Sequence, residues 1–99
     1  MKLQEALDQV GQLSDDKVIF ARRPWTLDTE AEIGTLEGEN LSVPQEVRNR
    51  GFEYFLDVSV AQEVLEVFGN REPTVDEMHA LLSHYAEHDA YPDWVYEQR

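Results

Sequence analysis

The sequence predicts a single α+β domain over residues 1–99, with a small three-stranded antiparallel sheet and about three helices packed on one face. Three observations lead to this class: a short apolar run at residues 17–21, a period-two alternation over residues 25–33, and two helical apolar stripes after residue 59. The expected order of elements is α-β-β-(short helix)-β-α-α.

The first half of the chain predicts one helix and two strands. Apolar residues at helical spacing indicate a helix over about residues 2–12. Residues 17–21 are apolar without polar alternation, so we expect a central strand that is covered on both faces. Between residues 25 and 33 the apolar residues all fall on odd positions, and the even positions are all polar, which predicts a strand with one solvated face. A helix over residues 28–36 is the alternative, because Glu and Ala favour helices.

The middle of the chain predicts a short helix and a third strand. Pro44 suits the first position of a helical turn over residues 43–47, which Gly51 closes. Residues 52–58 then alternate as a strand, in which Phe55 lies on one face and the other face carries Phe52, Tyr54, Leu56 and Val58.

Two capping boxes predict the starts of the last two helices. Ser59 and Gln62 form the first box, and Thr74 and Glu77 form the second. Pro92 is expected to end the last helix. The apolar stripe of the first helix is Val60, Val64, Val67 and Phe68, and that of the second is Val75, Met78, Leu81, Leu82 and Tyr85.

Net charge limits the classes of partner. The chain has 21 Asp and Glu residues against 8 Lys and Arg, a formal charge of −13. Such a protein repels nucleic-acid phosphates and anionic lipid head groups, so DNA, RNA and membranes are poor partners. A magnitude of about 2–8 is enough to keep a small domain soluble. The excess favours a cationic protein partner, with solubility alone as the simpler alternative.

Several kinds of chemistry have no support in the sequence. Without cysteine there is no disulfide, thiolate metal site or cysteine nucleophile. None of the serines lies in a G-x-S-x-G elbow, and there is no glycine-rich phosphate loop. We therefore expect no enzyme activity and no cofactor. The N-terminus is polar and lacks an apolar signal core, which predicts a cytoplasmic location.

One motif points the other way. His84, Glu87 and His88 match the H-x-x-E-H pattern of some metallopeptidases, and the two histidines would share a helix face. A catalytic zinc needs a third protein ligand and a substrate cleft, and the sequence shows neither. We expect two surface histidines and no metal site, which makes a metal-dependent hydrolase the least favoured function.

The first candidate binding segment is acidic. Five acids and no basic residue lie within twelve positions, and four of them, Asp28, Glu30, Glu32 and Glu37, are candidate partner-binding residues; the fifth is Glu39. On the predicted strand, Asp28, Glu30 and Glu32 would form a row at spacings of about 6.6–6.8 Å. The alternative is an ordinary solvated face.

The second candidate segment is the aromatic and acidic stretch at residues 89–97. Tyr91, Asp93, Trp94 and Tyr96 are its candidate partner-binding residues, because Tyr and Trp dominate binding hot spots and carboxylates select cationic partners. Alternatively, Trp94 and Tyr91 fold back to cover the end of the core.

Three segments carry a resemblance to a family of small acidic bacterial proteins: Arg23 to Asp28, Gly51 to Leu56 and Asp89 to Trp94. The chain is also similar in size, charge and layout to immunity proteins of polymorphic-toxin and contact-dependent growth-inhibition systems. That resemblance implies a non-catalytic protein that binds a cognate toxin with a basic surface, often a nuclease. The other interpretation is a nucleic-acid mimic that binds a housekeeping DNA-binding protein. An even row of carboxylates would favour mimicry, and a compact acidic patch ringed by aromatics would favour a toxin.

The H-x-x-E-H match leads to a first prediction. We expect no stoichiometric zinc after purification without a histidine tag and no peptidase activity, because a third ligand is missing. Elemental analysis measures the metal. About one zinc per chain would contradict this and revive the hydrolase.

Charge leads to a second prediction. Because 21 acids repel one another around a small core, added salt should raise the melting temperature between low and physiological ionic strength. Thermal unfolding monitored by circular dichroism measures this. An unchanged melting temperature would mean that the charges are already paired or dispersed, and would weaken the case for a dedicated acidic surface.

Overall fold

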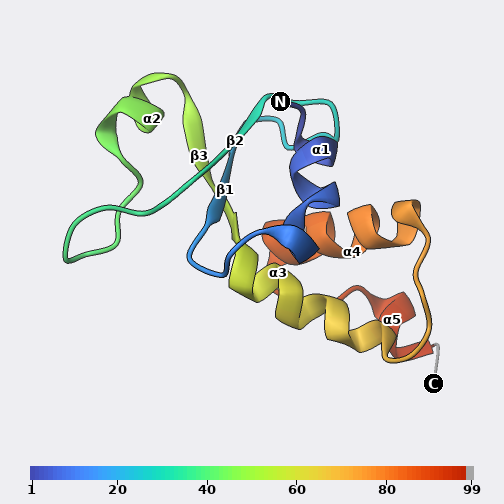
Figure 1. Cartoon of the computed structure of the whole chain (residues 1–99). Coiled ribbons are helices and arrows are strands. Elements are labelled where there is room, and N and C mark those ends of the chain that lie inside the picture. Colours follow the sequence, from blue (N-terminus) through green and yellow to red (C-terminus); the bar gives the residue numbers. More distant parts are fainter. Residues whose placement is uncertain (98–99) are drawn as a thin grey trace.

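The computed structural model of the protein describes residues 1–97 and has the predicted α+β architecture (Figure 1). The strands β1 (Val18–Arg22), β2 (Ala31–Gly34) and β3 (Phe52–Asp57) form an antiparallel sheet in the order β2-β1-β3. The helices are α1 (Leu3–Asp8), α2 (Gln45–Asn49), α3 (Val58–Val64), α4 (Val75–His88) and α5 (Asp93–Glu97), with 3-10 turns η1 (Val10–Gln12) and η2 (Leu65–Phe68). Helix α5 is an element that the sequence did not predict.

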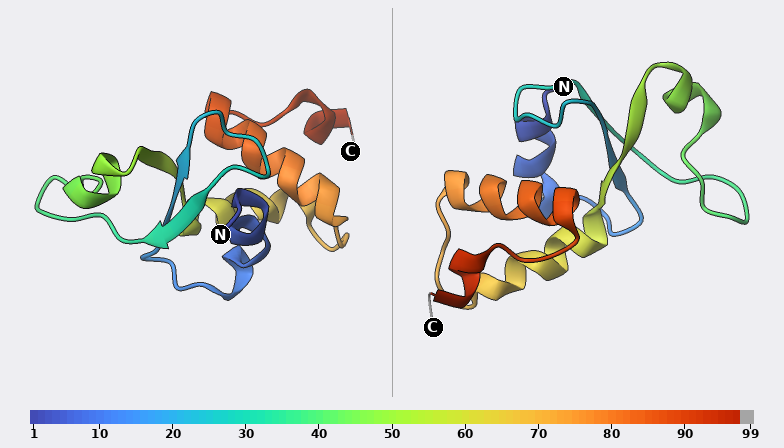
Figure 2. Two further views of the ribbon diagram at one scale, coloured as in Figure 1. Left: turned by 90° about the horizontal axis from the view of Figure 1, so that it is seen from above. Right: turned by 180° about the vertical axis from the view of Figure 1, so that it is seen from behind.

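Strand β1 is central and covered on both faces, as predicted. Its first four residues are at most 2% exposed. Ile19 and Ala21 enter a large cluster with α1, α3 and α4, whereas Val18 and Phe20 enter a small one with Val47 of α2. Figure 2 shows α2 on the opposite side of the sheet from α1, α3 and α4. The expectation that all helices pack on one face is therefore wrong for α2.

The second strand is shorter than predicted, and its start at Trp25 is wrong. Pairing with β1 begins at Ala31. Leu27, expected on the buried face, is 38% exposed. The residues before Ala31 form a turn whose carbonyls at Leu27 and Thr29 accept the N–H groups of Gln4 and Leu3, at 2.9 and 2.8 Å. These are N–H groups of the first turn of α1, which have no partner within the helix. The alternative helix over residues 28–36 is also wrong.

A β-bulge changes the predicted faces of β3. Ile19 pairs with Leu56 and Phe20 with Tyr54, so Phe55 is the additional residue. Phe55 and Leu56 both enter the large cluster, whereas Phe52 enters the small one. The prediction that Leu56 shares a face with Phe52 and Tyr54 is therefore wrong.

The two capping boxes have different outcomes. The box at Ser59 is wrong, because Asp57 takes the N-cap position of α3, without a hydrogen bond from its side chain to the helix. The Gln62 amide instead donates to the carbonyls of Val10 and Leu13, at 2.8 and 3.1 Å. The box at α4 is confirmed, because Thr74 Oγ1 accepts from Glu77 N at 3.1 Å and Glu77 Oε1 accepts from Thr74 N at 3.0 Å.

Helix α4 keeps most of its predicted stripe but ends earlier than expected. Leu81 and Leu82 are fully buried, whereas Val75 is 58% exposed. The helix ends at His88, where Asp89 takes a left-handed conformation with φ 53°, before Pro92 is reached.

The domain is elongated. It measures 43 × 26 × 22 Å along its principal axes, and α2 and α5 lie at opposite ends (Figures 1 and 2). None of the helices in residues 1–97 is both long and apolar enough to cross a bilayer.

The α4 capping box predicts an acid-dependent stability. A hydrogen bond from Arg71, together with the Thr74 backbone N–H, lowers the pKa of Glu77 from 4.5 to about 2. The resulting stabilisation is complete above pH 4.5 and is lost as the pH falls toward 2. Glu77→Gln should therefore lower the melting temperature at pH 7 and lower it much less at pH 2. The exposed neighbour Glu72→Gln is the control, and equal effects of both variants at pH 7 would refute the assignment.

Candidate functional site

The acidic segment does not form the predicted row of carboxylates. Asp28 lies in the turn before β2, where the Thr26 hydroxyl donates to it at 2.8 Å and lowers its pKa. Glu30 is exposed, with its carboxylate 3.8 Å from the N-terminal ammonium. Only Glu32 belongs to a strand. Because the chain turns between these residues, the evenly spaced row is a wrong prediction.

Glu32 also has a basic partner that is distant in the sequence. The guanidinium of Arg50, at the end of α2, binds it through two hydrogen bonds of 2.5 and 2.8 Å, and these lower the pKa of Glu32. Glu37 lies further along the chain, and its backbone pairs with Ser42 across a tight turn. The acidic segment is therefore spread from the sheet to the α2 end of the molecule.

The C-terminal segment packs against the helices. Trp94 stacks on Phe68 of η2, with ring centroids 6.4 Å apart, and remains partly exposed. Tyr91 meets Tyr85 edge to face at 5.5 Å. Tyr96 is 56% exposed. The segment thus covers one end of the core and also presents aromatic surface to solvent.

This aromatic surface lies among carboxylates. Burial raises the pKa of the Tyr91 hydroxyl, and the ionisable groups of Tyr85, Glu63, Tyr96 and Glu66 lie close enough to raise it further. Residues 57–97 contain ten Asp and Glu residues and one Arg. The helical half of the domain therefore carries most of the net negative charge.

Two hollows meet on the outer face of α4. One, of about 300 Å³, has Trp94 on its wall, and the other, of about 370 Å³, has Trp25. They share Asp76 and Ala80, which lie four residues apart on one helix face. The α4 groove, as we call this surface, is formed by Trp25, Leu27, Asp76, Ala80, Ser83 and Trp94. It places Trp94 of the second candidate segment and Trp25 of the turn after β1 beside the same face of α4. None of the acids of the first candidate segment lines these two hollows.

The polar groups of the α4 groove differ in their partners. Glu77, beside the groove, is paired with Arg71 at 3.0 Å. Asp76 is exposed and forms no ion pair within residues 1–97. The Ser83 hydroxyl oxygen is buried and finds no hydrogen-bond partner in the described part of the chain. The groove therefore offers the Asp76 carboxylate and the partly exposed Trp94 ring to a ligand.

The hollow next to Trp25 is also lined by His79, a buried histidine that the sequence analysis did not single out. His79 is 5% exposed, and its Nε2 lies 2.7 Å from Asp8 Oδ1 of α1. The sequence did not indicate this burial, because His79 lies outside the predicted apolar stripe of the helix. The contact links α4 to α1 and leaves His79 committed to the packing of the two helices.

The residues of the H-x-x-E-H motif have separate partners. His84 Nδ1 lies 3.0 Å from the Ala90 carbonyl oxygen, and Glu87 binds Arg23 at 2.9 Å. The rings of His84 and His88 are 4.5 Å apart. Among residues 1–97, no group of three or more His, Asp and Glu side chains is placed to hold a metal ion.

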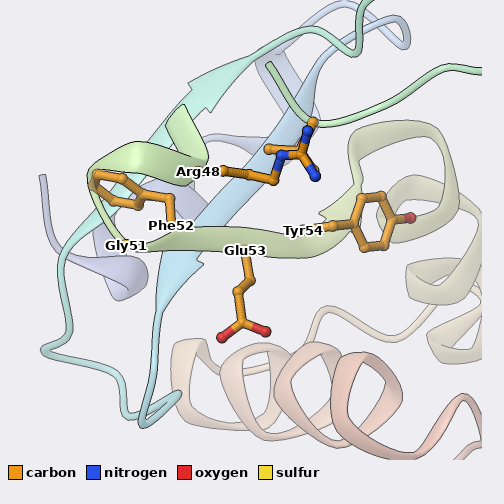
Figure 3. A pocket seen from close by; sticks show the side chains of 6 residues that line it. Arg48, Gly51, Phe52, Glu53 and Tyr54 are labelled. Atoms are coloured by element: carbon orange, nitrogen blue, oxygen red, sulfur yellow. The ribbon is translucent and has the colours of Figure 1, made fainter. Parts of the chain in front are cut away.

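A hollow larger than these two lies at the α2 end of the molecule. It has about 510 Å³ and lies along β3, beside α2 (Figure 3). Arg48 and Tyr54 lie on one side of the strand, and Glu53 points to the other side, toward α4. Two further arginines, Arg22 and Arg50, lie 4.7 and 5.3 Å from the Phe52 ring. This hollow contains none of the candidate partner-binding residues, although Gly51 to Tyr54 belong to one of the segments that carry the family resemblance. The arginines beside it distinguish it from the α4 groove.

Comparison with known proteins places the chain in a family. No curated protein and no solved structure matches it significantly. Residues 1–94 match the family described as "Domain of unknown function (DUF7716)". The chain therefore belongs to the DUF7716 family.

Proposed function

We propose that this protein is a non-catalytic, cytoplasmic immunity protein that binds and neutralises a cognate toxin with a basic surface, foremost a nuclease. The observation that supports this most is the α4 groove, an aromatic surface set into the acidic half of the domain. The proposed contact residues are Trp94 on the wall of the groove and Tyr91, Asp93 and Tyr96 in the same C-terminal segment. Asp28, which follows Leu27 of the other wall, and the exposed Glu30 complete the set.

Charge complementarity gives the physical reason. A nuclease presents Lys and Arg to the phosphates of its substrate, so an acidic protein is attracted to the same surface. Exposed carboxylates speed the encounter, and partly buried aromatic side chains slow dissociation. The likeness to immunity proteins in size, charge and layout supports the same choice.

The alternative of nucleic-acid mimicry has lost its main support. It relied on an even row of carboxylates, and Asp28, Glu30 and Glu32 do not form one. Acids grouped around aromatic side chains favour a folded protein partner with cationic side chains.

The test uses the protein encoded directly beside this chain. If that protein is a nuclease, we expect a stoichiometric complex on size exclusion and loss of nuclease activity on mixing. An unrelated protein of similar net charge is the control, because it separates specific neutralisation from charge screening. No complex, or equal inhibition by the control protein, would contradict the proposal.

Matched variants locate the surface. Asp28→Asn with Asp93→Asn should slow association by about two- to tenfold and flatten its salt dependence, with the fold unchanged. Glu39→Gln with Glu46→Gln removes the same charge away from the α4 groove and should have a smaller effect. Stopped-flow association at two salt concentrations measures both, and equal effects would place the interface elsewhere.

A further inference from the structure

We propose that the hollow between Trp94 and Asp76 is the pocket that receives a lysine or arginine side chain of the partner protein. This inference rests on the proposed function and names the place on the acidic surface where one cation docks. The occupant is a basic protein segment, whose charged head meets Asp76 and whose aliphatic stem lies along Trp94.

The hollow has the composition that such a side chain requires. Trp94 is held from behind by Phe68, which fixes an aromatic surface at the wall. Ala80 is small and leaves room beside it. Of the two carboxylates, Glu77 is paired with Arg71, so Asp76 is the one left for an incoming cation. An aromatic wall and an unpaired carboxylate together select a long cationic side chain.

The protein contains the same arrangement once already, occupied by its own arginine. The Arg23 guanidinium lies over Trp25, 3.4 Å from the ring centroid, and binds Glu87 of α4 at 2.9 Å. Asp76 lies on the same face of α4 as Glu87, about three turns away. Trp94 and Asp76 therefore repeat, at the other end of the helix, the pairing of an aromatic ring with an α4 carboxylate.

Intrinsic fluorescence tests the proposal directly. The protein has two tryptophans, and both line the α4 groove. Titration with a hexa-arginine peptide should give a saturable change in emission, and hexaglutamate should give none. The change should persist in Trp25→Phe, where Trp94 is the remaining fluorophore, and should be largely absent in Trp94→Phe, which keeps an aromatic ring against Phe68.

Two substitutions separate the pocket from general acidity. Asp76→Asn should weaken peptide binding about three- to tenfold, whereas Glu46→Gln, which removes the same charge on α2, should weaken it less. Ala80→Leu should weaken it without any change in charge, because it fills the hollow. Circular dichroism confirms that each variant is folded.

The outcomes are distinct for the two proposals. Three outcomes would overturn the proposed pocket. They are equal effects of Asp76→Asn and Glu46→Gln on peptide binding, unchanged peptide binding by Ala80→Leu, and peptide binding without a change in Trp94 emission. Any of these, combined with intact neutralisation of the toxin, would leave the proposed function standing. Loss of neutralisation in Asp76→Asn and Ala80→Leu, but not in Glu46→Gln, would support both.

Discussion

The structure depends on the burial of β1 on both faces. Four consecutive residues, 18–21, are almost fully inaccessible, and burying each large apolar side chain contributes about 1.5–3 kcal/mol. Such a strand needs a cover on each side. Helices α1, α3 and α4 cover the side of Ile19 and Ala21, whereas Val47 of α2 and Phe52 cover the side of Val18 and Phe20. The long, narrow shape and the separation of α2 from α5 follow from this requirement.

The same requirement decides where the charges lie. A domain of 99 residues has few large apolar side chains, and most of them are used in the two clusters. The outer faces of α3 and α4 are left polar, and here they are acidic. Ion pairs such as Arg50–Glu32 and Arg23–Glu87 connect loops to the sheet and to α4, and exposed pairs of this kind are worth about 0–1 kcal/mol each. The helical half has almost no cation to offset its carboxylates, so its acidity weakens the fold and is available to a partner.

The sequence predicts features that depend on neighbouring residues and misses those that depend on distant ones. The apolar run of β1 and the Thr74–Glu77 box carry their own signals, and both are confirmed. The alternation from Trp25 failed because the carbonyls of Leu27 and Thr29 bind α1 instead of a neighbouring strand. The bulge at Phe55 and the Arg50–Glu32 pair are likewise set by tertiary contacts. For the candidate site, the sequence singled out Trp94, but the placement of Trp94 and Trp25 beside the same face of α4 is a property of the fold.

Helix α4 joins stability to the proposed binding surface. One face carries Leu81 and Leu82 in the core, and the other carries Asp76, Ala80 and Ser83 in the groove. A partner that docks there meets a helix already held by the core, so little conformational entropy is lost on binding. The two groove tryptophans also pack against the large cluster. Substitutions of these aromatics therefore disturb packing and binding together. Substitutions of an exposed, unpaired carboxylate such as Asp76 leave the packing of the core intact, which makes the carboxylates the sharper probes of function.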